Sequence, residues 1–360
     1  MLTMTAYKLP LVLLLMMVIV SAGSLIQLQP VSATFPGANG KIVFTRSVGA
    51  AGPQRQIFTV NPDGSGLTQL TFDGTNMGPR WSADGTKIVF NSNRVTPTDA
   101  DGSMEIWIMN ADGSGQTQIT FNPNSVGVSN PAFSPDGSKI VFISNQPPST
   151  DFNVWVMNAD GSNQQQLTTA TAQEQTPVWS PSGSKIVFTS FRNGLPHIFV
   201  MNVDGLGQTD LSNSPSESDW APEWSPDGRM IAFSRLLQAG GEAIWVMNAD
   251  GTGKNQLSNP PNGLDDMCPA WSPDGTKIAF ARGEDSIWVM NADGSNPVDI
   301  TASQPNSDTD FEPNWQPLRA NPVGGLVMAT NKLEIVAPFA ALAGLIAAVS
   351  AVVAVKRRRD

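Results

Sequence analysis

The chain has one cysteine and one histidine among its 360 residues. A single thiol, Cys268, cannot form an intrachain disulfide or a multi-thiolate metal site, so we interpret it as a small buried apolar residue. A single imidazole, His197, cannot supply a zinc triad, and a Ser-His-Asp triad would have to use it. His197 opens an apolar segment and has no spaced partner, so we predict a structural role and no catalytic residue.

Positive charge is also scarce. Lysine and arginine number 21 against 31 acidic residues, and the formal net charge is −10. Nucleic-acid phosphates require a basic surface. We therefore expect no nucleic-acid partner.

Helical periodicity is missing between residues 38 and 318, and a repeated segment takes its place. The segment Trp-Ser-Pro-Asp-Gly-x-Lys-Ile-x-Phe recurs, complete or altered, at steps of 44 to 52 residues. Its anchors are Trp81, Phe133, Trp179, Trp224, Trp271 and Trp315. A repeat of about 40–50 residues with this strand-like pattern predicts a β-propeller.

Each repeat predicts four strands, which we name a to d. Strand a is Pro-x-Trp, and the Ser-Pro-Asp-Gly turn leads into an apolar strand b such as 139–142. Strand c resembles 154–157, Asn-Ala-Asp-Gly forms the next turn, and strand d resembles 166–168. Nearly continuous apolar runs in b and c indicate a sheet covered on both faces.

The repeats predict an all-β fold, a six-bladed propeller of four-stranded antiparallel blades. The first strand b, at Ile42, has no Pro-x-Trp before it, and Trp315 has no strand b after it. We predict that residues 313–317 supply strand a of the first blade and close the ring, with Asn314 to Gln316 pairing with Lys41 to Phe44. An open solenoid of six repeats is the alternative, but it would leave an orphan strand at each end.

These motifs resemble the TolB-type, WD-repeat-like β-propellers over Asn39 to Pro317. The resemblance implies a six-bladed propeller that serves as a protein-binding platform outside the cytoplasm. Members named TolB also carry an amino-terminal α/β domain, for which this sequence offers no room. We therefore do not expect the partners of TolB to apply here.

Both ends carry membrane signals. Residues 1–33 combine Lys8, an apolar run and a small-residue pattern ending at Ala33, which predicts a signal peptide. Cleavage after Ala22 and an uncleaved anchor are alternatives. The propeller is assigned to 34–317 and a flexible stalk to 318–334, where the glycine pair at 324–325 lies.

Residues 335–355 predict a transmembrane helix, and residues 356–360 form a basic tail. The positive-inside rule places this tail in the cytoplasm. We therefore expect a single-pass membrane protein with a monomeric, extracellular or periplasmic propeller.

Ligand-binding residues are predicted on the face formed by the long b–c and d–a loops, because varied loops on a rigid scaffold are where binding usually resides. The carboxylates Glu174, Asp219, Asp266 and Asp310 occupy equivalent places, three residues before each strand-a proline. Arginines after strand b, including Arg192 and Arg235, reach the same face, and Trp220 lies in one of its loops. The alternative is that these arginines pair with the acids between neighbouring blades and hold the disc together.

The Asp-Gly turns suggest calcium through their Asn-x-Asp-Gly spacing, but they lack the further carboxylates and closing glutamate of a calcium loop. We expect hairpin turns, no metal and no cofactor.

The leading interpretation is a non-catalytic cell-surface binding or scaffolding propeller for a protein, peptide or glycan. One alternative is a propeller-type polysaccharide lyase or glycosidase that uses carboxylates at the channel mouth, which would require two acids not paired with arginine. Another is a purely structural component of the cell envelope.

Overall fold

The computed structural model describes residues 38–318 apart from 49–53, 98–101, 123–125, 239, 262, 284–285 and 302–308. The predicted signal peptide, transmembrane helix and basic tail, and the stalk beyond Leu318, lie outside these residues. The described part of the chain contains strands and turns, and no apolar helix of membrane-spanning length.

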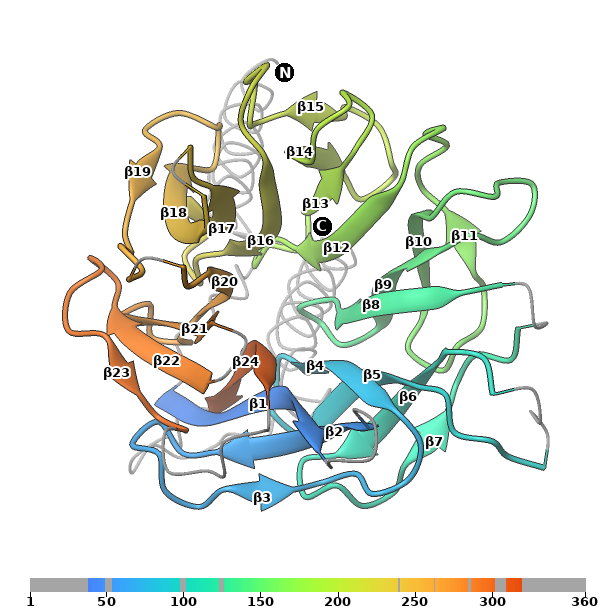
Figure 1. Cartoon of the computed structure of the whole chain (residues 1–360). Coiled ribbons are helices and arrows are strands. Elements are labelled where there is room, and N and C mark those ends of the chain that lie inside the picture. The colour runs from blue at the N-terminus through green and yellow to red at the C-terminus, as the bar shows by residue number, and fades with distance from the viewer. Residues whose placement is uncertain are drawn as a thin grey trace, which may run out of the picture. The chain divides into compact units, whose positions relative to one another are not determined.

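Six four-stranded antiparallel sheets form the blades of a propeller (Figure 1). Blade 1 contains β24 (Asp310–Leu318), β1 (Ala38–Val48), β2 (Gln54–Val60) and β3 (Thr68–Gln69). Blade 2 contains β4 (Asn76–Trp81), β5 (Lys87–Ser92), β6 (Glu105–Asn110) and β7 (Thr117–Gln118). Blade 3 contains β8 (Val128–Phe133), β9 (Lys139–Ser144), β10 (Asn153–Asn158) and β11 (Gln165–Gln166).

The remaining blades repeat this order of strands a to d. Blade 4 contains β12 (Glu174–Trp179), β13 (Lys185–Ser190), β14 (His197–Asn202) and β15 (Thr209–Asp210). Blade 5 contains β16 (Asp219–Trp224), β17 (Met230–Leu236), β18 (Glu242–Asn248) and β19 (Asn255–Gln256). Blade 6 contains β20 (Asp266–Trp271), β21 (Lys277–Arg282), β22 (Ser286–Asn291) and β23 (Val298–Asp299).

The last strand closes the ring as predicted. Figure 1 shows β24 beside β1, although the two strands come from opposite ends of the described chain. Ile42 pairs with Trp315, and Val43 pairs with Asn314. Closure removes the edge strands that an open array of repeats would expose.

Apolar side chains fill the spaces between blades. Successive side chains of strand b pack on opposite faces of the blade. Ile42 and Phe44 join the cluster between blades 6 and 1, and Val43 joins the cluster between blades 1 and 2. This two-sided burial explains why strand b is apolar at consecutive positions. The strand-b phenylalanines are fully buried, and each contributes roughly 1.5–3 kcal/mol relative to an exposed ring. They are Phe44, Phe90, Phe142, Phe188, Phe233 and Phe280.

Tight turns join strands c and d, and glycine is required there. In the turn after β10, the Gly161 nitrogen donates to the Asn158 carbonyl at 2.9 Å, with φ of 87° at the glycine. A Cβ at this position would lie 1.9 Å from the Ile119 carbonyl oxygen of blade 2, the preceding blade. The glycine therefore serves both the turn and the packing between blades.

Every strand a contains a bulge immediately before its proline. The preceding residue has a positive φ, between 47° and 62° across the six blades, and the register with strand b shifts at this point. The six residues are Gly78, Asn130, Thr176, Ala221, Cys268 and Glu312. Five of them are not glycine, so the fold imposes a left-handed conformation that side chains disfavour. The bulge turns part of strand a toward the central channel.

Candidate binding site at the mouth of the central channel

Strand a lies innermost in each blade, and the residue between its proline and its aromatic anchor differs among blades. Arg80 of β4 and Glu223 of β16 are charged members of this set. The others are Ala132, Val178, Ala270 and Asn314. Blades 2 and 5 lie opposite each other in the ring of six, so these two charges face each other across the channel.

An ion pair bridges the channel. Arg80 Nη1 donates to Glu223 Oε2 at 2.6 Å, and the two side chains are 26% and 15% exposed. The bond joins strands that are not neighbours in any sheet. It therefore ties opposite sides of the disc directly to each other.

An apolar cavity of about 140 Å³ lies on the side of the tight a–b turns, and we call it the mouth cavity. Its wall is formed by the strand-a aromatic anchors and by turn residues such as Pro135 and Pro181, and it includes Arg80 and Glu223. The anchors are Trp81, Phe133, Trp179, Trp224, Trp271 and Trp315. The indole nitrogens of the five tryptophans are buried and have no hydrogen-bond partner. The rings therefore present carbon atoms to the cavity.

A second cavity of about 60 Å³, the inner chamber, is lined by the six bulge residues and by Arg80. Arg80 lines both cavities, whereas Glu223 lines only the mouth cavity. Glu312 of the chamber accepts hydrogen bonds from the Gly78 nitrogen at 2.8 Å and from Thr45 Oγ1 at 2.9 Å. The bond from Gly78 connects the closing strand β24 to blade 2, and the bond from Thr45 lies within blade 1.

Cys268 also lines the inner chamber. Burial, and to a smaller degree the negative charges of Glu312 and Glu242, raise the pKa of its thiol from 9.0 to about 12. A thiol with this pKa is protonated at neutral pH and is a poor nucleophile. Cys268 as a whole is partly buried, whereas we predicted a small buried apolar residue.

Three of the predicted loop-face carboxylates, Asp219, Asp266 and Asp310, have no exposed surface. Each binds both terminal oxygens to Nε and Nη2 of one arginine, at 2.6 to 2.8 Å. The partners, in the same order, are Arg235, Arg282 and Arg46.

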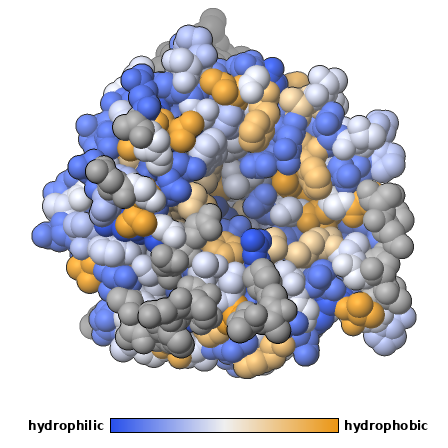
Figure 2. Space-filling model, in the orientation of Figure 1, coloured by the Kyte–Doolittle hydropathy of each residue, from blue (hydrophilic) through white to orange (hydrophobic). Residues whose placement is uncertain are grey.

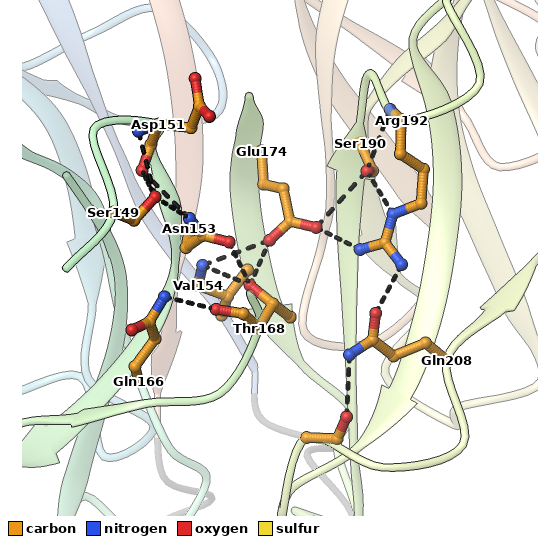
Figure 3. A network of polar contacts seen from close by, with 11 residues as sticks. Ser149, Asp151, Asn153, Val154, Gln166, Thr168, Glu174, Ser190, Arg192 and Gln208 are labelled. Carbon is orange, nitrogen blue, oxygen red and sulfur yellow. Dashed lines mark hydrogen bonds and ion pairs between the residues drawn. The ribbon is translucent and has the colours of Figure 1, made fainter. Parts of the chain in front are cut away.

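Glu174 is buried in a wider network (Figure 3). One carboxylate oxygen accepts from Arg192 and from Ser190 Oγ within blade 4. The other accepts from Thr168 Oγ1 and from the Val154 nitrogen of blade 3. Figure 3 shows Glu174 between these two groups of donors. Its side chain therefore connects two blades.

The expectation that the arginines pair with acids of neighbouring blades was wrong. Arg235 and Asp219 are register partners in one blade, and the same holds for Arg282 and Asp266. Glu174 adds a contact across a blade interface, to Thr168 and Val154 of blade 3. The paired guanidinium groups also stack on aromatic rings, as Arg235 does on Phe233 and Trp245 at 5.4 and 4.7 Å.

Blades 2 and 3 depart from this pattern. In blade 2 the carboxylate position holds Asn76, whose Oδ1 accepts from Arg94 Nη2 at 2.9 Å. Burial lowers the pKa of Arg94, and the negative charge of Asp73 opposes that shift. In blade 3 the position holds Val128, paired with Ser144.

Trp220 is half-buried, and its indole Nε1 donates to Glu242 Oε2 at 2.6 Å. The seven predicted loop-face residues are spread over blades 4, 5, 6 and 1, and each is engaged in contacts within the protein. A ligand role for them stays a prediction. The four carboxylates do not meet the requirement of the glycosidase alternative, because each is paired with an arginine.

His197 is buried, and its Nδ1 lies 2.8 Å from Asp210 Oδ2. The Asp-Gly turns bond internally: Asp160 Oδ1 accepts from the Ser162 nitrogen and from Ser162 Oγ. Within the described ranges, no group of three or more His, Cys, Asp or Glu side chains is arranged to hold a metal ion.

Sequence reasoning placed the candidate site on the opposite face and missed Arg80 and Glu223. The signal was present, because charged residues occupy the middle of Pro-x-Trp in only two repeats. Their facing positions depend on the repeat count, since the second and fifth of six blades lie opposite each other.

Comparison with known proteins supports the predicted resemblance. A family model described as "TolB beta propeller domain" matches residues 145–321. The crystal structure of TolB from Acinetobacter baumannii is similar, with a TM-score of 0.66 and 20% identity over 77% of this chain and 67% of that chain.

Two curated proteins are similar in sequence. Dipeptidyl-peptidase 5 of Porphyromonas gingivalis is 34% identical over 198 residues, which is 52% of this chain and 26% of that protein. The Tol-Pal system protein TolB of Rhizorhabdus wittichii is 43% identical over 47 residues, 13% of this chain and 10% of that protein. The chain thus spans about a quarter and about a tenth of the lengths of these relatives.

Proposed function

Because the chain carries a TolB-like six-bladed β-propeller, we propose that it is a non-catalytic binding module that holds a segment of another protein at its mouth cavity. The observation that carries this proposal is the wall of six aromatic anchors, one from each blade, around a single concavity. Ligand sites are typically concave and mostly apolar, with a few polar groups that orient the ligand. The Arg80–Glu223 pair supplies those polar groups here.

The outer surface is a weaker candidate for the binding site than the mouth cavity. Figure 2 shows isolated hydrophobic residues among hydrophilic ones on the face in view. Exposed large apolar residues are spread over different blades, as Phe72, Leu206 and Val298 illustrate. Scattered apolar residues of this kind are normal for a protein surface.

A binding role also agrees with the pairing of the acidic side chains and of His197. The buried carboxylates that an enzyme would need are paired with arginines, and His197 is paired with Asp210. We further propose that the propeller is displayed outside the cytoplasm, through the apolar segment 335–355 and the signal segment 1–33.

The test is selection of a phage-displayed dodecapeptide library on the full chain in detergent micelles. Ala83 lies in the a–b turn of blade 2 and lines the mouth cavity, so Ala83→Trp should cover the cavity and abolish binding of the selected peptides. Leu206→Trp is the matched control, because Leu206 is exposed in a c–d turn on the same side of the disc. Peptides that bind both variants as tightly as the wild type would disprove the proposal.

A further inference from the structure

We infer that the mouth cavity selects a cation at the end of an aliphatic stem, which is the side chain of a lysine or arginine from a protein partner. This inference rests on the proposed binding function and names the chemistry of its ligand. Three features of the cavity support it.

The first feature is unused acceptor capacity on Glu223. Arg80 reaches the carboxylate through one nitrogen and one oxygen, and Glu223 Oε1 has no hydrogen bond within the described part of the chain. By contrast, Arg235 satisfies both oxygens of Asp219. An ionised carboxylate offers about four acceptor positions. Glu223 can therefore receive a second cation without releasing Arg80.

The second feature is the balance of charge along the channel. The charged residues that line the two cavities are Arg80, Glu223 and Glu312, one cation and two carboxylates. In the a–b turn of blade 3, Asp136 directly follows Pro135, which lines the mouth cavity; hydrogen bonds from Ser134 and Ser138 lower the pKa of Asp136, so it stays ionised. Such a surrounding attracts a positive group and repels a negative one.

The nearby lysines do not cancel this charge at the cavity. Lys185 Nζ donates to Asn202 Oδ1 at 2.9 Å, and Lys277 Nζ donates to Asn291 Oδ1 at 2.9 Å. Both acceptors lie at the ends of strand c, further from the channel than strand a. These ammonium groups are therefore held toward the outer part of the blades.

The third feature is the wall. Tryptophan and proline carbons surround the space above Glu223, and the tryptophan N–H groups are buried elsewhere. A lysine or arginine side chain carries a run of methylene groups below its charged head, and such stems pack on apolar surfaces. An anionic side chain would have a shorter stem and would meet Glu223 and Glu312. The cavity therefore fits a long cationic side chain better than an acidic one.

The experiment uses three capped heptapeptides, Gly-Ser-Gly-X-Gly-Ser-Gly, in which X is lysine, norleucine or glutamate. Binding to the full chain in micelles is measured at millimolar peptide by intrinsic tryptophan fluorescence, because five tryptophans line the cavity. We expect the lysine peptide to bind about fivefold more tightly than the norleucine peptide, and the glutamate peptide to bind least.

Variants of the two charged residues should change the preference for the lysine peptide in opposite directions. Glu223→Gln should bring the ratio of the affinities for the lysine and norleucine peptides to about one. Arg80→Met should raise this ratio, because Glu223 then loses its internal partner. The double variant R80M/E223Q leaves no unpaired charge and should again show no lysine preference, which covers the case in which a single variant fails to fold. Equal binding of all three peptides, a glutamate preference or no binding would overturn this inference. The proposed function would still stand if library peptides remain sensitive to Ala83→Trp.

Discussion

Ile42 and Trp315 face each other as register partners across the ladder that closes the ring. Trp315 is 3% exposed and belongs to the apolar cluster that joins blades 6 and 1. One side chain of the last strand thus contributes to both the sheet pairing and the interface between the first and last blades.

Removal of the Trp315 indole should weaken the closure of the propeller. We expect Trp315→Ala to lower the free energy of unfolding by about 3–5 kcal/mol, through lost burial and a residual cavity. Chemical denaturation of the full chain measures the change. Leu318→Ala, at the 41% exposed end of the same strand, is the control and should change stability by less than about 0.5 kcal/mol. Equal effects of the two substitutions would argue against closure through β24.

The Asp219–Arg235 pair distinguishes a structural carboxylate from a ligand-binding one. Both side chains are at most 5% exposed, and Asp219→Asn leaves the buried Arg235 with the half-exposed Glu217, 2.8 Å from its Nη1, as its remaining carboxylate. We expect a loss of about 1.5–3 kcal/mol in unfolding free energy, because the two charge-assisted hydrogen bonds to Asp219 are weakened. Arg229→Gln is the control, because its ion pair with Asp227 is exposed and 3.8 Å long. An unchanged or raised melting temperature for Asp219→Asn would favour the ligand site predicted on the loop-rich face.

The Cys268 thiol should resist alkylation in the folded protein. Its pKa is raised to about 12, so very little thiolate forms at pH 8, and a maleimide should react only after unfolding. Because the folded pKa lies above the reference value of 9.0, the thiol favours the folded state below about pH 9 and loses this effect as the pH rises toward 12. Mass spectrometry with and without denaturant checks the reaction. Rapid labelling of the native chain would show that the chamber is open.

Serine side chains hold the turn aspartates ionised. The Asp63 pKa is lowered mainly by the Ser65 hydroxyl and then by the Ser65 backbone nitrogen. Its contribution to stability is present above pH 3.8 and is lost as the pH falls through the lowered pKa. Ser65→Ala should raise the Asp63 pKa toward the ordinary value, as an NMR titration would report. Asp160 in the same variant is the internal control and should keep its lowered pKa.

Protease protection in intact cells tests the proposed display. Protease added outside should digest the propeller and leave a fragment that contains residues 335–360. Neutral residues in place of 356–359 should weaken the orientation, because the positive-inside rule depends on them. A propeller that is digested only after lysis would contradict the proposal.

Much of the fold could be predicted from the repeats, for definite physical reasons. Two-sided burial makes strand b apolar at consecutive positions, and the unmatched Ile42 and Trp315 segments indicated the closing pair. Strand d proved shorter than predicted: β11 ends at Gln166, and Thr168 Oγ1 instead accepts from the Val154 nitrogen at 2.9 Å. The Leu167 nitrogen still donates to the Val154 carbonyl at 2.8 Å, so the Thr168 hydroxyl takes the place of a backbone acceptor only.

The site was harder to predict because it depends on register and on the ring as a whole. The strand-a bulge shifts the pairing so that Asp219 faces Arg235 of its own blade, and a bulge of this kind leaves little trace in the sequence. The contact between Arg80 and Glu223 depends on the channel diameter. No single repeat determines that width.

Ring closure by β24 also has a consequence in time. At about 5–20 residues per second, synthesis of the chain between β1 and β24 takes on the order of tens of seconds. Throughout that interval blade 1 lacks its innermost strand, and the apolar cluster between blades 6 and 1 lacks Trp315. A nascent propeller cannot mature blade by blade into a finished ring. Its completion waits for the arrival of the last strand, so the unfinished chain must be kept from aggregating until then.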